Sequence, residues 1–371
     1  MYNECIQLTR QFAFCPNAFR IDLYKGCDFG CKYCFANMDW IQHKDKAWDV
    51  ANINKIEKLF HKAFETDKES KDILVELLRH KVPLHCGGMS DPFQTREKEY
   101  GYTYRLLELS NKYDYPVMFS TKASSLPDNK YYDILNPKIH AFQVSIMGWD
   151  DDYIRKWECN TPTAQERLEF VKLLRSKGFW WGIRIQPIID IVQCEKLCYN
   201  IGDIPSYVTV EHFKSILDTK AVIDNFYKLC DNKEDFEFAS HKLQFKRDTK
   251  IRNIKRLQDI CNKNGVLIGV GDNDLHYMSQ SRCCCGIDTV GEAFNNYLKY
   301  NLTYMSTGVI PDNLFIPQCN PRKHINDQKY GLKIDCKQYV NDYISNHLDY
   351  CGGCKQQLEK KLFGISKGKL F

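Results

Sequence analysis

The sequence predicts an α/β fold built on a parallel sheet, and three observations support this. Short apolar runs alternate with amphipathic, helix-like segments along residues 1–271, as in repeated βαβ units. Polar and cysteine-containing segments follow these runs, where the carboxyl ends of parallel strands would meet. The 371-residue chain is 43% hydrophobic, enough for one large domain and an appendage.

The expected elements follow one another as strand and helix. The expected strands span residues 19–26, 82–88, 117–122, 140–146, 180–189 and 266–271. The expected helices span residues 52–80, 97–113, 163–178 and 249–264. The third of these helices ends at Gly178, a residue type that commonly terminates helices.

Residues 272–371 lack this alternation and contain seven cysteines. We therefore expect a separate cysteine-rich C-terminal module beside a barrel domain of residues 1–271. The chain has no uncharged apolar run of about 18 residues, so no membrane helix is expected. Its first residues lack the basic start and apolar stretch of a signal peptide, which predicts a cytoplasmic protein without a membrane partner.

Three cysteines, Cys27, Cys31 and Cys34, lie in the segment GCDFGCKYCFA at the spacing C-x3-C-x2-C. Four thiolates complete an iron-sulfur site, so three would hold a 4Fe-4S cluster and leave one iron open. A structural zinc site usually pairs two C-x2-C hooks within about 15–20 residues. The next cysteine, Cys86, is too far along the chain for that, so the segment favours a cluster over zinc or buried thiols.

This segment resembles the cluster loop of radical S-adenosylmethionine (SAM) enzymes, with Tyr33 as the aromatic residue before the last cysteine. Residues 87–110, 120–124 and 144–189 resemble the spore photoproduct lyase-like ("DNA repair photolyase") branch of that family, so the likeness covers roughly residues 18–190. The resemblance implies a partial (βα)6 TIM-type barrel with the cluster loop after the first strand. It also implies that SAM binds the open iron and is reductively cleaved to a 5′-deoxyadenosyl radical, which abstracts hydrogen from a substrate.

The same resemblance assigns roles to single residues. The three cysteines would be the catalytic cluster ligands, and Tyr33 would pack beside the adenine of SAM. Gly87 and Gly88 match the family's glycine pair, where bare backbone can approach the amino group of SAM. The glutamate that usually follows this pair is a methionine here, so Ser90 or Asp91 would have to substitute for it.

Three polar residues on later strands complete the expected cofactor site. Lys122 would pair with the SAM carboxylate, Ser145 would contact the ribose, and Arg184 is a candidate for a carboxylate or a substrate phosphate. Three of the expected cofactor residues also have a structural reading. Lys122 could be a solvated strand end, Ser145 a packed small residue, and Asp91 the N-cap of the next helix.

Eighteen cysteines in a chain with no secretory signal argue for metal ligation and an anaerobic setting. In the C-terminal module, Cys351 and Cys354 form a C-x2-C hook. With Cys336 and Cys284, the latter from the triple SRCCCGIDT, this hook would hold an auxiliary iron-sulfur cluster. A four-cysteine zinc site would use the same residues, so both metals stay open. Three adjacent cysteines cannot easily bind one ion, so at least one would be an inert thiol or a hydrogen-atom donor.

The sequence thus predicts a radical SAM enzyme acting on a nucleobase in DNA or on a nucleotide, and the net charge of +5 is compatible with such a partner. The C-terminal cysteines favour an alternative, the modification of a peptide or protein side chain with an auxiliary cluster. A third reading, a non-catalytic metal protein that binds nucleic acid, is disfavoured by residues 87–92 and 120–122. A reductase, flavodoxin or ferredoxin would supply the electron.

Overall fold

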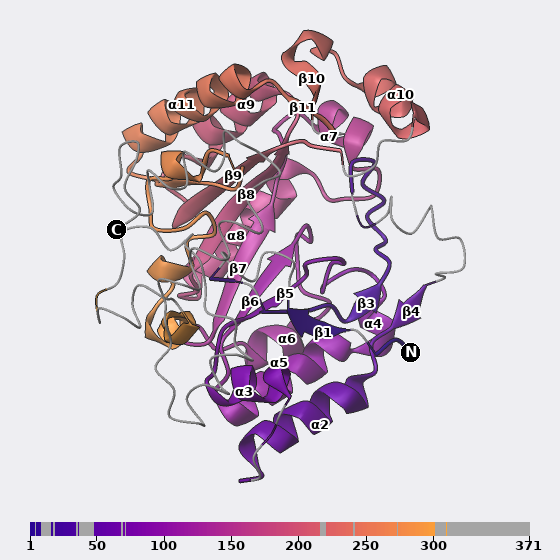
Figure 1. Ribbon diagram of the computed structural model, residues 1–371, viewed down its shortest axis with the longest axis vertical. Coiled ribbons are helices and arrows are strands. Elements are labelled where there is room, and N and C mark those ends of the chain that lie inside the picture. Colours follow the sequence, from indigo (N-terminus) through magenta and orange to yellow (C-terminus); the bar gives the residue numbers. More distant parts are fainter. Residues whose placement is uncertain are drawn as a thin grey trace, which may run out of the picture.

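The computed structural model describes residues 1–3, 5–8, 16–17, 19–34, 36, 48–67, 70, 72–215, 220–239, 242–272, 274–300 and 309. Its main sheet contains β1 (Ile6–Leu8), β2 (Phe19–Ile21), β5 (Leu84–Cys86), β6 (Val117–Thr121), β7 (His140–Ser145), β8 (Trp181–Ile188), β9 (Tyr207–His212) and β12 (Ile268–Val270). The strands lie in the order β1-β2-β5-β6-β7-β8-β9-β12 (Figure 1). β1 is antiparallel to β2, and all other neighbours are parallel. Within the described residues the sheet is open, because β1 and β12 end this order.

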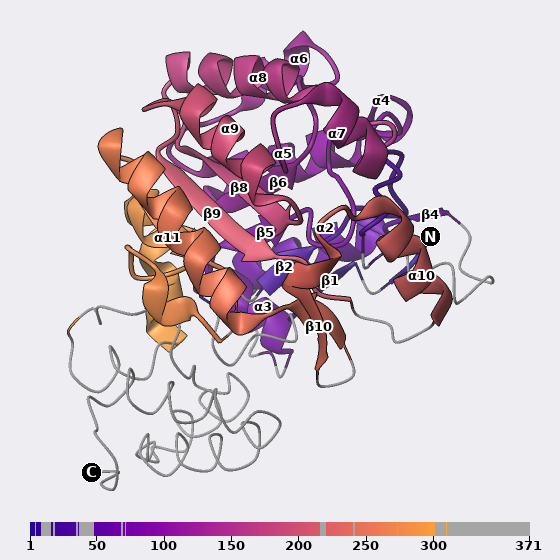
Figure 2. The same ribbon diagram turned by 90° about the horizontal axis from the view of Figure 1, so that it is seen from above.

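Helices form a layer along the outer face of this sheet. The described helices are α2 (Ile53–Phe64), α3 (Ile73–Arg79), α4 (Glu97–Tyr100), α5 (Tyr102–Tyr113), α6 (Asn129–Ile134), α7 (Asp151–Trp157), α8 (Ala164–Ser176), α9 (Ile191–Ile201), α10 (Lys220–Leu229) and α11 (Arg247–Lys263). α8 and α9 pack on β8, and α11 packs on β12 and α9 (Figures 1 and 2). A capping box between Thr163 and Glu166 fixes the start of α8.

Alternate residues of the strands belong to two different apolar clusters, as the two-residue period of a strand requires. Phe119 and Phe142 lie in the main core between the sheet and the helices. Met118 and Ala141, their neighbours in sequence, pack on the opposite side against Cys283 and other residues of the segment after β12. We call this opposite side, which carries Met118 and Ala141, the inner face.

Shorter elements complete the described chain. They are the antiparallel pairs β3 (Tyr24–Lys25) with β4 (Asp49–Val50) and β10 (Phe236–Ala239) with β11 (Lys242–Phe245), and the 3-10 helices η1 (Lys233–Asp235), η2 (His276–Met278), η3 (Ile287–Thr289) and η4 (Glu292–Tyr300). Residues 283–298 pack on the inner face, so the described start of the predicted C-terminal module lies against the barrel sheet. The boundary at residue 272 stays a prediction. No helix in the described part of the chain is long and apolar enough to cross a membrane.

The predicted α/β parallel sheet is confirmed, with local differences. The expected helix 97–113 is two helices, because Gly101 takes a left-handed conformation (φ 64°) between α4 and α5. The expected helical stretch 52–80 is likewise divided into α2 and α3. β9 was not predicted, although it lies between β8 and β12 and completes the row of parallel strands.

Candidate active site

The three cysteines of the predicted cluster loop lie directly after β3. Backbone contacts join this loop to the segment that follows α7: Cys31 forms an antiparallel bridge with Glu158, and the Lys32 N–H donates to the Trp157 carbonyl at 2.8 Å. The Cys34 N–H donates to the Cys31 carbonyl at 3.1 Å, which closes a tight turn. A segment distant in sequence therefore fixes the loop.

The thiols of this loop lie in a buried, low-dielectric setting. Cys27 and Cys31 are each near enough to Cys34 for their charges to interact. Burial and the charge of Asp91 raise the pKa of the Cys27 thiol to about 12, and burial also raises the pKa of Cys31. Such thiols ionise when a metal supplies positive charge beside them.

The chemistry of this donor set fits a 4Fe-4S cluster. Among the described residues, no three His, Cys, Asp or Glu side chains converge where a single metal ion could be held. A cubic cluster takes one thiolate on each iron, so its ligands need not meet at one point. One buried thiol, Cys31, and two half-buried thiols, Cys27 and Cys34, on a glycine-containing loop satisfy that requirement and leave one iron without a cysteine.

A buried ion pair supports the loop from behind. The Tyr33 hydroxyl donates to Glu158, which also accepts from Arg167 at 2.7 Å, and neither Glu158 nor Arg167 has any exposed side-chain surface. Burial raises the pKa of Glu158, but the charges of Arg167 and Lys122 and the hydrogen bonds outweigh it, so the net pKa is lowered. Arg167 also donates to the Ser145 carbonyl at 2.7 Å, which joins the loop to the end of β7.

Lys122 lies where β6 ends, next to the cluster loop. Its ammonium is 5.8 Å from the centroid of the Tyr33 ring. Burial lowers the pKa of the Lys122 ammonium. The charges of Cys31, Glu158 and Cys34 raise it by more than burial lowers it, so the net pKa is raised and Lys122 is a cation. Lys122 is thus half-buried at a strand end beside the cysteines, and its pairing with the SAM carboxylate stays a prediction.

The loop after β5 carries the predicted glycine pair. Gly87 has a φ of 101°, and a Cβ placed there would lie 2.3 Å from the Ser120 carbonyl oxygen, so no side chain fits. The Asp22 carboxylate accepts the Met89 N–H at 2.6 Å and is also bonded to the backbone of Gly88 and Ser90. Asp22 thus fixes this loop from β2.

Asp91 fixes the other end of the same loop. Its carboxylate accepts the Thr121 hydroxyl at 2.7 Å, the Lys122 N–H at 2.7 Å and the Phe93 N–H at 2.9 Å. It does not cap the next helix, α4, which starts at Glu97. Its known bonds tie the loop to the end of β6, and Ser90 is buried beside it.

A row of bonded polar side chains crosses the inner face. His85 Nε2 lies 2.7 Å from the Ser120 hydroxyl, and Ser120 donates to Gln143 at 3.3 Å. Arg184 donates to the same Gln143 oxygen at 2.8 Å and also to Gln186. The row therefore links four adjacent parallel strands, β5 to β8.

The three adjacent cysteines form part of the inner face. Their carbonyls accept bonds from the sheet: Cys283 from Tyr207 at 2.7 Å, Cys284 from Thr209 at 2.7 Å, and Cys285 from the Gln143 amide at 2.9 Å. The Cys283 and Cys285 sulfurs are 3.7 Å apart. The backbone of these three cysteines, which we call the floor, is thus hydrogen-bonded to β7 and β9 across the inner face.

Cys284 is the half-buried member of the three. A hydrogen bond with Cys285 lowers its pKa; burial raises it, and the charge of Arg184 lowers it. Its neighbour Cys285 accepts from Gln143 of the polar row, which places Cys284 beside that row. The other residues predicted to hold an auxiliary cluster, Cys336, Cys351 and Cys354, lie outside the described residues.

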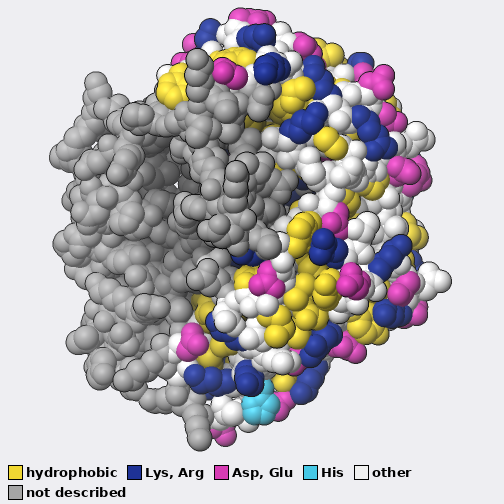
Figure 3. Space-filling model, turned by 90° about the vertical axis from the view of Figure 1, so that its right-hand side faces the viewer, with side chains coloured by type: hydrophobic (Ala, Val, Ile, Leu, Met, Phe, Trp, Pro, Cys, Tyr) yellow, Lys and Arg dark blue, Asp and Glu magenta, His cyan; other side chains and the backbone are white. Residues whose placement is uncertain are grey.

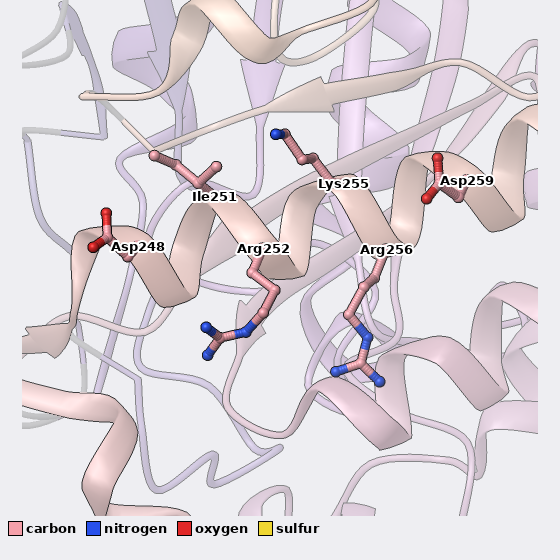
Figure 4. Close-up of a pocket in the computed structure, with 6 residues that line it drawn as sticks. All are labelled: Asp248, Ile251, Arg252, Lys255, Arg256 and Asp259. Carbon is pink, nitrogen blue, oxygen red and sulfur yellow. The ribbon is translucent and has the colours of Figure 1, made fainter.

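The described surface offers two further observations. A hollow of about 370 Å³ lies along the outer side of α11, lined by Asp248, Ile251, Arg252, Lys255, Arg256 and Asp259 (Figure 4). None of these residues belongs to the inner face or the cysteine loop.

On the face in Figure 3, basic and acidic side chains are interspersed over the described part, without a large patch of one sign.

Sequence reasoning missed several residues of this site. Asp22, Arg167 and Glu158 are not among the site residues predicted from the sequence, and Glu158 is fully buried. Glu158 and Arg167 lie inside the block 144–189, so the resemblance marked their region. No sequence pattern marks Asp22, because its role depends on hydrogen bonds from the backbone of a loop much later in the sequence.

Residues 21–185 match the family model described as the Radical SAM superfamily. The chain carries a radical SAM domain over residues 21–185 and is an enzyme. Enzymes of this superfamily use a 4Fe-4S cluster and SAM. The predictions of family, enzyme class and cofactors are confirmed.

Individual relatives are distant. An uncharacterized protein of Methanocaldococcus jannaschii is 25% identical over 252 residues, which are 66% of this chain and 88% of that protein. One of Mycobacterium tuberculosis is 22% identical over 189 residues, 47% of this chain and 50% of that protein. A solved structure of spore photoproduct lyase is similar with a TM-score of 0.50 at 16% identity, covering 69% of this chain and 78% of that one. At this identity the likeness shows a shared fold alone.

Proposed function

We propose that this radical SAM enzyme abstracts hydrogen from a nucleobase, in DNA or in a nucleotide. The observation that carries the proposal is that separate sequence blocks resembling the spore photoproduct lyase-like branch contact one another. Cys31 pairs with Glu158, and Asp91 accepts from Lys122. The blocks around residues 27–34, 87–92, 120–124 and 144–158 thus make one site at the carboxyl edge, as expected of parallel α/β enzymes.

Within this site the cofactor roles are divided among neighbouring loops. The three cysteines of the cluster loop hold the cluster, and Tyr33 packs beside the adenine of SAM. The bare backbone of Gly87 and Gly88, with Ser90, receives the amino group of SAM. Lys122 pairs with the carboxylate of SAM, because it is a half-buried cation next to the cluster loop.

Two further roles follow from the bonds described above. Ser145 contacts the ribose, since it ends β7 beside the Tyr33 and Glu158 support. Asp91 acts through the backbone that it fixes, because its carboxylate is already bonded to Thr121, Lys122 and Phe93. We therefore propose a positioning role for Asp91, in place of the direct contact with SAM considered for it from the sequence.

The substrate class is tested by SAM turnover. The anaerobically reconstituted enzyme, reduced in the presence of SAM, should form 5′-deoxyadenosine faster with single-stranded DNA, nucleotides or both than alone. Cys31→Ala should abolish the product, whereas Cys159→Ala, at an exposed cysteine, should not. Stimulation by peptides only would contradict the nucleobase proposal.

A second candidate substrate is a peptide or protein side chain, with an auxiliary cluster in the C-terminal module. One observation favours it: Cys284 lies beside the polar row of the inner face, where an additional cluster would be near the substrate. Iron and zinc should be counted in the wild type and in Cys351→Ser and Cys354→Ser variants. Loss of iron with retained zinc supports the auxiliary cluster, and loss of zinc alone rules it out.

A further inference from the structure

Arg184 is a cation held in place by neutral groups. Its guanidinium donates to the amide oxygens of Gln143 at 2.8 Å and of Gln186. No carboxylate lies within ion-pair distance of it among the described residues. These two bonds leave further N–H donors of the guanidinium unused, because a guanidinium carries five.

No described carboxylate neutralises Arg184, although its charge lowers the pKa of the nearby Cys284 thiol. Glu211, on the neighbouring strand β9, pairs instead with Lys214 at 2.7 Å and accepts from Gln186. On the other side, burial and the charges of Arg184 and Arg20 lower the pKa of His85 to about 3, so His85 is neutral. A half-buried positive charge without a counterion is costly unless an anion completes the site.

We propose that Arg184 is the centre of an oxyanion site on the inner face that binds the phosphate of a nucleotide substrate. This deepens the proposed function and rests on it for the identity of the substrate. Planar guanidinium groups match the oxygens of phosphate in a bidentate geometry. The amide oxygens of Gln143 and Gln186 hold the guanidinium of Arg184 in place, so its side chain loses little conformational entropy when an anion binds.

Arg184 borders the proposed SAM site through Ser145, its register partner on β7, but it lies on a different strand from Lys122. Lys122, at the end of β6, lies against Tyr33 and the cysteine loop. Arg184 lies on β8, with β7 between, and it borders the floor made by the cysteine triple. One cation is therefore available to the carboxylate of SAM, and the other is left for the substrate.

The test is a comparison of binding by each deoxynucleoside and its 5′-monophosphate to the reconstituted, SAM-loaded full chain, measured by anaerobic titration calorimetry. A charge-assisted hydrogen bond contributes about 1.5–3 kcal/mol, so the wild type should prefer the best monophosphate over its nucleoside by roughly tenfold or more. Arg184→Gln should reduce this preference to below about twofold. Arg175→Gln, on the outer helix α8, is the matched control and should keep it.

A second variant keeps the proposal testable if Arg184→Gln folds poorly. Gln186→Glu retains Arg184 but supplies it with a carboxylate, so the phosphate preference should also be lost. Loss of SAM affinity in Arg184→Gln, with the phosphate preference intact, would overturn the proposal and assign Arg184 to SAM. The proposal would also be overturned if Arg184→Gln weakened the binding of acidic peptides but not the binding of monophosphates.

The outcomes separate this inference from the proposed function. If DNA or nucleotides stimulate SAM cleavage but Arg184→Gln keeps the phosphate preference, the oxyanion site is wrong and the nucleobase function stands. If nucleotides bind through Arg184 but only peptides stimulate SAM cleavage, the function is wrong and an anion site remains.

Discussion

Arg167 and Glu158 form an ion pair of 2.7 Å in which neither side chain is exposed to solvent. Glu158 also accepts the hydroxyl of Tyr33 from the cluster loop, and Arg167 bonds the carbonyl that ends β7. The pair therefore links the end of β7 to the cysteine loop and fixes the position of the loop relative to that strand. Its effect on function is indirect, because it acts through the loop that it supports.

Removing one member of this pair should leave a buried charge unpaired. We expect Glu158→Gln and Arg167→Met each to lower the free energy of unfolding by about 3–5 kcal/mol. Equilibrium denaturation of the metal-free chain measures this. The exposed pair Lys172–Glu169 is the control, and Glu169→Gln should change stability by less than about 0.5 kcal/mol.

Gly87 should tolerate no side chain. In Gly87→Ala the added Cβ would meet the Ser120 carbonyl at 2.3 Å, so we expect a loss of roughly 3 kcal/mol or more in stability, or a displaced loop with weakened SAM binding. Gly178→Ala is the control, because that glycine also has a positive φ but nothing lies within 4 Å of its Cβ. Equal losses in stability and SAM affinity for the two variants would contradict the close approach.

Asp22→Ala should release the loop that carries the glycine pair. The variant removes the acceptor of the Met89 N–H and of the neighbouring backbone groups, so we expect SAM affinity to fall by roughly tenfold or more. The affinity can be measured by anaerobic equilibrium dialysis. Iron content per chain should stay unchanged, and its loss would show that Asp22 supports the cluster loop instead.

The buried pair of His212 and Asp272 should make stability depend on acid pH. Burial raises the pKa of Asp272, but its contact with His212 at 2.7 Å outweighs this and lowers the net pKa to about 2. A carboxyl whose folded pKa is below its unfolded value stabilises the fold above the unfolded pKa, and this stability is lost as the pH falls toward 2. The difference in unfolding free energy between wild type and Asp272→Asn should therefore shrink from pH 5 to pH 3. A constant difference would contradict a lowered pKa for Asp272.

The sequence predicted those parts of the molecule whose cause is local. The alternation of apolar runs and helices predicted the parallel sheet, and the C-x3-C-x2-C spacing predicted the cluster loop. β9 was missed because it is a short run within residues 190–248, where small elements are separated by polar turns. Asp22 and the burial of Glu158 were missed because each depends on partners brought together only by the fold.

The most direct test of the central claim is label transfer into 5′-deoxyadenosine. The reduced enzyme should be given SAM with nucleotides or oligonucleotides deuterated either on the base or on the sugar, and the product analysed by mass spectrometry. We predict deuterium from base-labelled substrate only, with none in the Cys31→Ala control. Deuterium from a labelled peptide, with none from any nucleotide or oligonucleotide, would contradict the account.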